Sequence, residues 1–190
     1  VIGGYRFYER LEIRDAIAYF RVVQKNNDDL ALERIYNTPK RGIGTATLQK
    51  IFKFARDSGM TLLDASKKIV ETDELTPNAR DNIKQFIENI NSWKSKINKI
   101  NHIELAKIVL EESGYTKMWL NDKSIEAPGR LENLKELISA LRDFSNMNEF
   151  LEHISLVMEN ERNYKIDMVN IMTMHAAKGL EFENVFLAGW

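Results

Sequence analysis

Hydrophobic residues recur at helical spacing along most of the chain. In residues 12–24 they give one apolar face, which is the pattern of an amphipathic helix. The same period predicts further helices, with apolar stripes formed by Leu48, Ile51, Phe52 and Ala55; by Ala79, Ile83, Phe86, Ile87, Ile90, Trp93 and Ile97; by Ile103, Ala106, Val109 and Leu110; by Leu131, Leu134, Leu137, Ile138, Leu141 and Phe144; and by Phe150, Leu151, Ile154 and Met158. The middle of the chain is therefore predicted to be all helical.

Polar residues mark where these helices begin and end. Asn26–Asp29 is predicted to start a short helix to about Tyr36, Thr61 with Asp64 is a variant capping box, and Thr76-Pro77 pairs an N-cap with proline at the first helical position. Gly114 is predicted to close the helix before it. Four apolar residues are predicted to dock under the loop 121–124: Tyr115, Met118, Trp119 and Leu120. The segment Glu159–Lys165 is predicted to be a charged linker.

At both ends of the chain, the helical spacing of hydrophobic residues gives way to short continuous apolar runs. Val1-Ile2, the run with Val169, Ile171 and Thr173, and the run 185–187 are apolar and partly β-branched, as in strands buried on both faces. The predicted fold class is mainly α, with an all-helical domain flanked by short strand and helix pieces of an α/β domain. We also expect the chain to be a piece of a larger protein.

Composition narrows the classes of function. The 190 residues include 44% hydrophobic and 29% charged residues, no cysteine and three histidines, so a thiolate metal site is excluded and a zinc site is not expected. No apolar run approaches the roughly 20 residues of a membrane helix, and we expect a cytoplasmic protein without membrane contact. The net charge of −1 means that any nucleic-acid surface must be a local patch.

One such patch is the segment Thr38-Pro39-Lys40-Arg41-Gly42-Ile43-Gly44-Thr45. Two glycines allow a tight turn, free amides would precede the N-terminus of the next helix, and the basic residues Lys40, Arg41, Lys50 and Lys53 are close in sequence. A turn with free N–H groups at a helix N-terminus binds phosphate. The alternative is a tight turn with a solvated basic flank. By contrast, Asp73-Glu74 lies in a polar loop and is predicted to be solvated rather than to hold magnesium.

A second candidate site lies in residues 168–190. Between the two apolar runs, Thr173, His175, Lys178 and Glu181 would stand at the exit of a strand, where open α/β sheets bind ligands. The alternative is that His175 only caps a turn and that Glu181 is a surface acid.

The string Thr173-Met174-His175-Ala176-Ala177-Lys178-Gly179-Leu180-Glu181-Phe182 resembles motif V of the UvrD/Rep/PcrA group of superfamily 1 DNA helicases. This resemblance implies that Thr173 and His175 contact single-stranded DNA and that Glu181 meets the nucleotide ribose. Met174 and Ala176 depart from the usual Leu and Ser, and Ala176 lacks the hydroxyl that a serine would offer.

Three other blocks extend the resemblance over the chain. Gly3, Gly4, Phe7, Arg10, Glu12, Ile13 and Asp15 match the segment before the inserted domain of these helicases, and Arg130–Leu137 is similar to a later block of that domain. In that later block, Arg130 and Glu132 are expected to clamp helices together, and the alternative is that they meet another domain. The Gly42–Gly44 turn resembles the helix-hairpin-helix element of the inserted domain, which implies that Lys40, Arg41, Gly42, Ile43, Gly44 and Thr45 hold the backbone of duplex DNA.

The resemblance implies a division into three parts: residues 1–24 and 166–190 belong to the second motor domain (2A), and residues 25–165 form the helical insertion (2B). The longer protein would be a 3′–5′ DNA helicase of repair or replication that uses ATP and Mg²⁺. The sequence contains no Gly-x-x-x-x-Gly-Lys-Ser/Thr loop, so we expect the chain alone neither to bind these cofactors nor to hydrolyse ATP.

The expected partners are a junction of duplex and single-stranded DNA, read without sequence specificity, the rest of the motor, and repair proteins. Two alternatives stay open at this point: a non-catalytic helical module that binds proteins, and part of an AddA/RecB-type helicase–nuclease.

Overall fold

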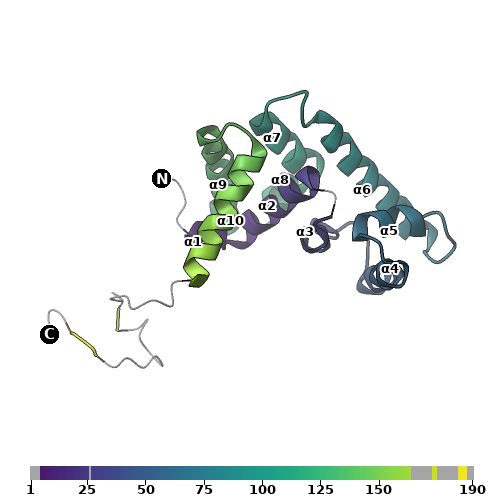
Figure 1. Ribbon diagram of the computed structural model, residues 1–190, viewed down its shortest axis with the longest axis horizontal. Helices are drawn as coiled ribbons and strands as arrows, with labels where there is room; N and C mark the ends of the chain where they lie inside the picture. The colour runs from purple at the N-terminus through teal and green to yellow at the C-terminus, as the bar shows by residue number, and fades with distance from the viewer. Residues whose placement is uncertain (1–4, 26, 164–172, 175–183, 188–190) are drawn as a thin grey trace.

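The computed structural model describes residues 5–25, 27–163, 173–174 and 184–187 (Figure 1). Regular secondary structure within these residues is helical, as predicted for the middle of the chain. The elements are α1 (Tyr5–Tyr8), α2 (Leu11–Gln24), α3 (Asp29–Ile35), α4 (Thr45–Ser58), α5 (Leu62–Ile69), α6 (Pro77–Lys96), α7 (His102–Glu112), α8 (Tyr115–Asn121), α9 (Ala127–Ala140), the 3₁₀ helix η1 (Leu141–Asp143) and α10 (Met147–Asn163).

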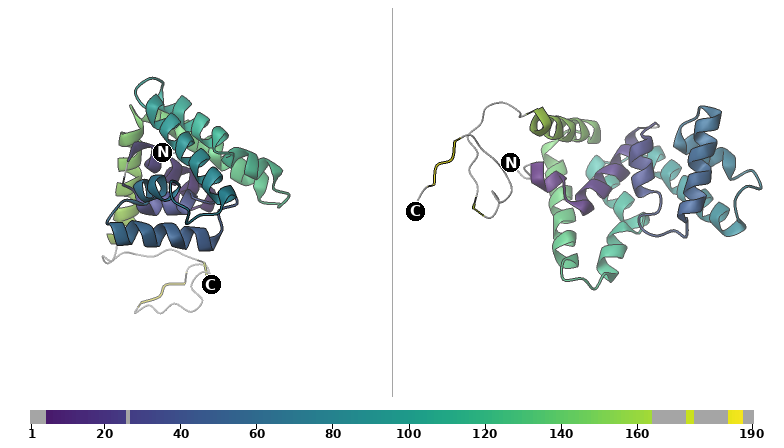
Figure 2. Two further views of the ribbon diagram at one scale, coloured as in Figure 1. Left: turned by 90° about the vertical axis from the view of Figure 1, so that its right-hand side faces the viewer. Right: turned by 90° about the horizontal axis from the view of Figure 1, so that it is seen from below.

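Helix α2 is the centre of the fold. It contacts α3, α6, α7, α9 and α10, and most of its residues are buried, including Ile13 and Tyr19, which are both 0% exposed. Its buried residues also include two acids, Glu12 and Asp15. Helices α4 and α5 pack on each other at one end of the molecule, while α1 and α10 lie at the other (Figures 1 and 2). The segment before α4 is therefore held at an end of the helical body.

The predicted helix boundaries are largely confirmed. The Thr61 hydroxyl accepts from the Asp64 amide at 3.2 Å, and the Thr76 hydroxyl accepts from the Ala79 amide at 3.4 Å, with Pro77 in the first turn. Gly114 adopts φ +79° and follows Ser113, the C-cap of α7. Each start residue satisfies an amide that the helix itself leaves open.

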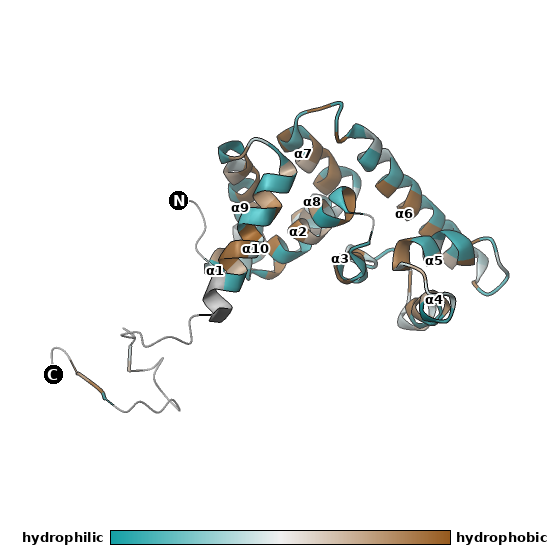
Figure 3. Ribbon diagram, viewed as in Figure 1, coloured by the Kyte–Doolittle hydropathy of each residue, from teal (hydrophilic) through white to brown (hydrophobic). Residues whose placement is uncertain are grey.

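Helix α6 buries the apolar stripe that the sequence predicts for it. Its predicted stripe is buried from Ala79 to Trp93, and Ile97 is partly buried. Figure 3 shows apolar and polar residues mixed along the helices rather than gathered in one of them. Within the described ranges, no helix has both the length and the apolar character that a membrane span requires.

Two predictions, one for residues 115–120 and one for the segment from Glu159, need correction. Residues 115–121 form helix α8, and Leu120 is 65% exposed instead of docked, because it faces away from buried Tyr115 and Trp119. The charged segment from Glu159 does not begin a linker, since α10 continues to Asn163. Charged residues are good helix formers, so a polar run prolongs a helix that apolar residues have already anchored.

The predicted strand at 185–187 is not confirmed. Val185, Phe186 and Leu187 have no regular secondary structure, and Phe186 is 94% exposed. A strand needs a neighbouring strand to take up its backbone hydrogen bonds, and the described residues supply none here. The predicted strands at 1–2 and 168–172 lie outside the described residues.

The two sequence blocks singled out near Glu12 and Arg130 meet in space. Asn133 Nδ2 donates to Glu12 Oε1 at 2.6 Å, and Arg10 Nη1 donates to Asn133 Oδ1 at 2.5 Å. Arg130 lies 3.9 Å from Glu12 Oε2 and 4.6 Å above the Trp119 ring. The prediction that Arg130 clamps helices is confirmed for α9 and α2. Glu132 does not share this role, because it is exposed and pairs with Lys135 of the same helix.

Asp15 is a second buried acid of α2. Its carboxylate accepts from the Tyr115 hydroxyl at 3.0 Å and pairs with Arg34 at 2.6 Å, which ties α2 to α8 and α3. Burial nevertheless raises the pKa of the Asp15 carboxyl, because the loss of solvation outweighs the attraction of the Arg34 charge. The attraction between Asp15 and Arg34 is therefore partly offset by the cost of burying the carboxylate.

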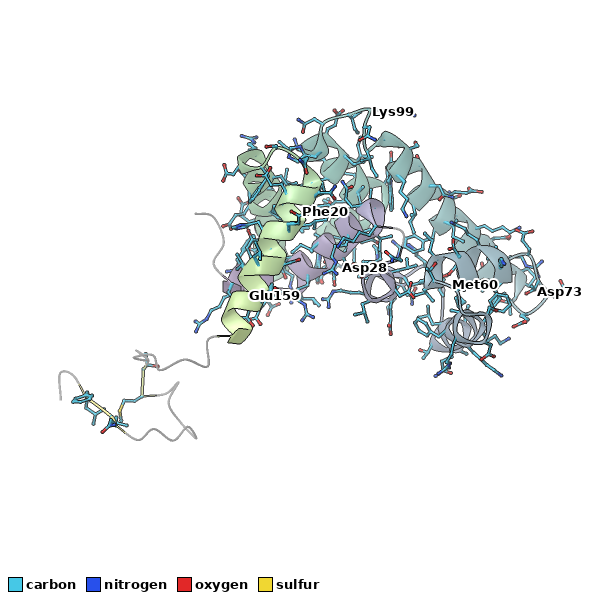
Figure 4. All side chains as sticks on the ribbon, viewed as in Figure 1. Phe20, Asp28, Met60, Asp73, Lys99 and Glu159 are labelled. Atoms are coloured by element: carbon cyan, nitrogen blue, oxygen red, sulfur yellow. The ribbon has the colours of Figure 1, made fainter. Side chains whose placement is uncertain are left out.

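The loop between α5 and α6 carries the acidic pair Asp73-Glu74. Both side chains are exposed, Asp73 lies at the outer edge of the molecule (Figure 4), and Arg80 contacts it at 3.3 Å. The prediction that this pair is solvated is confirmed.

The division between 2A and 2B stays a prediction. Within the described part of residues 1–24, α2 packs inside the helical body and not apart from it. The predicted boundary at residue 24 therefore coincides with the end of a core helix.

Candidate nucleic-acid interface

The segment 37–45 forms a tight turn between α3 and α4. The Asn37 Oδ1 atom accepts from the Arg41 amide at 2.7 Å, Gly42 has φ +70°, and Gly44 is the N-cap of α4 with φ −74° and ψ 166°. Only glycine adopts the conformation of Gly42 without strain. Ile43 between the two glycines is 0% exposed and anchors the turn in the core.

The side chain of Arg41 points into the protein. Its Nη1 atom donates to the carbonyl oxygens of Ile35 at 2.8 Å, Tyr36 at 3.3 Å and Pro39 at 3.2 Å. Its Nη2 atom donates to the Ser113 carbonyl oxygen at 3.4 Å and to the Tyr19 hydroxyl. The contact between this guanidinium and DNA stays a prediction, and in the structure Arg41 bonds to protein oxygens.

Tyr19 supports the turn from the central helix. Its hydroxyl donates to the Thr38 carbonyl oxygen at 2.6 Å while it accepts from Arg41. Burial raises the pKa of Tyr19, and the nearby Arg41 charge offsets this only in part. The phenol therefore keeps its proton at neutral pH and stays a hydrogen-bond donor.

The N-terminus of α4 faces outward without a side-chain cap. Gly44 contributes no cap hydrogen bond, and the first turn of α4 carries no acidic residue. Thr45 is exposed at the first helical position, and a Cβ atom built on Gly44 would meet nothing within 4 Å. The first amides of α4 are thus open to an external acceptor, at the end of a helix where its dipole favours negative charge.

The basic residues near this N-terminus differ in whether their side chains bond to other parts of the protein. Lys40 and Lys53 are exposed. Lys50 is exposed as well, but its Nζ atom donates to the Glu74 carbonyl oxygen at 2.8 Å. Of the predicted DNA contacts, Lys40, Gly42, Gly44 and Thr45 are therefore at the surface, whereas the side chains of Ile43 and Arg41 serve the interior of the turn.

Two shallow hollows lie away from this turn. They have volumes of about 420 and 610 Å³ and share Ile17, Arg21 and Ile154 as lining residues from α2 and α10. Their charged side chains include Arg21, which pairs with Asp28 at 2.6 Å. The N-terminus of α4 lies at the surface and lines neither hollow.

The predicted contacts in the last part of the chain are only partly described. Thr173 is exposed and belongs to no helix or strand. His175 and Glu181 lie outside the described residues, so their predicted contacts to DNA and ribose stay predictions.

Sequence reasoning missed the residues that support the turn from behind. Asn37 has a signal in the sequence, because an Asn before a turn commonly bonds to a nearby backbone amide. Tyr19 and Ser113 have none, since they are 22 and 72 positions from Arg41 and reach it only through the packing of α2 and α7.

Comparison with known proteins places the chain in a family. Residues 1–190 match the model of the UvrD-like helicase C-terminal domain. The whole chain is 46% identical to part of the DNA helicase II of Rickettsia typhi, 36% to that of Escherichia coli and 35% to the ATP-dependent DNA helicase PcrA of Bacillus subtilis. It spans 27% to 29% of the length of these relatives. The chain belongs to the UvrD-like helicase C-terminal domain family.

Proposed function

We propose that the chain is part of an ATP-dependent DNA helicase, and that the turn 40–45 with the start of α4 holds the phosphate backbone of duplex DNA beside a single strand. The names of the relatives support the helicase assignment. Contacts of this kind position DNA without reading its sequence.

The observation that carries the proposal is the open N-terminus of α4. Glycine at the N-cap leaves room for a phosphate to approach the amides, and the exposed ammonium of Lys40 lies on the same turn. Amides and helix dipole supply directed donors, and lysine supplies a point charge, which together are the usual elements of a phosphate site.

The test compares Lys40→Glu with a matched change at Lys107, an exposed lysine of α7. The ligand is a fluorescent DNA hairpin with a 3′ single-stranded tail, titrated with the 190-residue chain at several salt concentrations. Lys40→Glu should weaken binding and reduce the slope of log affinity against log salt by about 0.9 for a lost phosphate contact. Lys107→Glu should leave both unchanged.

Two outcomes would count against the proposal. If Lys40→Glu and Lys107→Glu bind the hairpin as tightly as the unaltered chain, the turn is not the DNA contact. If the unaltered chain shows no salt-dependent DNA binding, the alternative of a protein-binding helical module gains support.

We further propose that Thr173 and His175 contact the single strand and that Glu181 meets the ribose of ATP. Other parts of the longer protein would hold the complex of ATP with Mg²⁺. Movement would be 3′ to 5′, in repair or replication and in the cytoplasm. These assignments rest on the motif that begins at Thr173. In the full-length protein, Glu181→Ala should raise the ATP concentration needed for half-maximal hydrolysis, and an unchanged value would contradict the assignment.

A further inference from the structure

Beneath the proposed DNA contact, the side chain of Arg41 donates hydrogen bonds to five protein oxygens. We propose that Arg41 is a positioning residue, which shapes the Gly42–Thr45 turn from inside so that the amides of α4 face a phosphate. It acts without touching the DNA. This inference rests on the proposed function of the turn.

The hydrogen bonds of Arg41 join three separate segments. Its guanidinium collects carbonyl oxygens from the end of α3 (Ile35 and Tyr36), from the turn itself (Pro39) and from the junction of α7 and α8 (Ser113). A guanidinium has five N–H donors in one plane, and lysine has three donors on a single nitrogen. Arginine can therefore serve this divergent set of acceptors, and lysine cannot.

Aromatic rings fix the plane of the guanidinium. The Arg41 Cζ atom lies 4.3 Å from the centroid of the Phe86 ring and 5.9 Å from that of Tyr19. Phe86 comes from α6 and Tyr19 from α2, and both rings are almost completely buried. Cation–π contact of this kind is attractive and orients the charged group. The contacts of Arg41 thus fix the position of the turn relative to helices α6 and α2.

The same contacts explain why Arg41 does not serve as a phosphate ligand. Both of its terminal nitrogens already donate to protein oxygens, so binding a phosphate would break bonds that hold the turn. An arginine used in this way contributes geometry, whereas exposed Lys40 contributes charge at the surface.

Tyr19 offers the cleanest test, because it is 0% exposed and cannot contact DNA. Tyr19→Phe removes the hydroxyl that links Arg41 to the Thr38 carbonyl oxygen and keeps the ring. Tyr36→Phe is the matched control, since Tyr36 is 1% exposed and its hydroxyl donates to Ser66 Oγ at 2.8 Å. Arg41 contacts only the backbone carbonyl oxygen of Tyr36, which this substitution keeps. Hairpin affinity is measured at a temperature where circular dichroism shows all variants folded.

Tyr19→Phe should weaken hairpin binding about fivefold, which corresponds to one typical hydrogen bond, and Tyr36→Phe should leave binding unchanged. Amide hydrogen exchange at residues 43–47 should become faster in Tyr19→Phe only. Arg41→Lys keeps the charge and should weaken binding at least as much as Tyr19→Phe does.

The outcomes separate this inference from the proposed function. If Lys40→Glu abolishes binding while Tyr19→Phe and Arg41→Lys bind normally, the positioning role is wrong and the DNA contact stands. If Arg41→Lys binds normally but Arg41→Met does not, Arg41 acts through its charge, which also overturns the positioning role. If Lys40→Glu binds normally, the DNA contact itself is wrong.

Discussion

Helices α4 and α5 follow each other in the chain and pack together, but their N-termini are built differently. At α5 the Leu62 amide donates to Asp29 Oδ1 at 2.9 Å, and the Asp64 amide donates to the Thr61 hydroxyl at 3.2 Å. At α4 the N-cap is Gly44, and no side chain of the described residues caps the helix. One start is closed by protein oxygens and the other is open.

The difference shows what each start is for. A carboxylate at a helix N-terminus is held by the amides and by the dipole, so Asp29 serves α5 as an internal anion. At α4 no capping side chain plays this part, and Lys40 and Thr45 are exposed on the adjoining turn. An external anion such as a phosphate would complete α4 in the way that Asp29 completes α5. Three pairs of substitutions test this comparison, ordered by their effect on the free energy of unfolding.

The largest effect is expected at the glycines that flank α4. Gly42 and Gly59 both have positive φ, +70° and +61°, but a Cβ atom at Gly42 would lie 3.1 Å from Asn82 Nδ2, and one at Gly59 would meet nothing within 4 Å. Both alanine substitutions should lower the free energy of unfolding by about 1–2 kcal/mol in urea titrations. Gly42→Ala should cost more and should weaken DNA binding, because the turn must shift; equal costs and unchanged binding would show that the turn tolerates a side chain.

The next substitution makes α4 resemble α5. Gly44→Asp places a favoured capping carboxylate on a backbone that already has N-cap angles, so it should raise the free energy of unfolding by about 0.5 kcal/mol. The same carboxylate occupies the amides and should weaken hairpin binding about tenfold or more by repelling phosphate.

Gly129→Asp is the control for added charge, since Gly129 is exposed in the first turn of α9 and has open space around its Cβ position. It should also stabilise the fold without loss of DNA binding. If both variants bind DNA alike, the open start of α4 is not a phosphate site.

The smallest effect concerns the closed start of α5 and its pH dependence. The hydrogen bond from Lys67, 3.1 Å from Asp64 Oδ1, holds the pKa of the Asp64 carboxyl below its ordinary value. The stabilisation is therefore fully present above the unfolded pKa of about 3.9 and is lost as pH falls through the folded value. Because Asp64 is exposed, the effect is only about 0.3 kcal/mol.

Asp64→Asn should therefore be less stable than the unaltered chain at pH 6, and the difference should shrink towards pH 2. Asp81→Asn on α6 is the control, because Asp81 is exposed and has no ion pair within the described part of the chain. Urea titrations across this pH range measure both. If the difference in free energy of unfolding does not change with pH, the Asp64 carboxylate does not stabilise the start of α5.

The limits of sequence reasoning are clearest at Arg41. Lys40 and Arg41 are adjacent, have the same charge and were predicted to contact DNA together. In the fold, Lys40 is exposed and Arg41 reaches Ser113, which is 72 positions away. Nothing in the local pattern separates them, because their directions depend on where α2, α6 and the α7–α8 junction offer oxygens and rings.

The sequence alone determined the helical body, because an apolar period and capping residues such as Thr61 and Thr76 act over a single turn of helix. It also determined the tight turn, since Gly42 and Gly44 permit a backbone that other residues resist. Only the tertiary structure decided which basic side chain faces solvent and which amides stay open. The direction of each side chain and the exposure of each amide depend on contacts between segments that are distant in sequence. These contacts form only when the whole helical body is assembled.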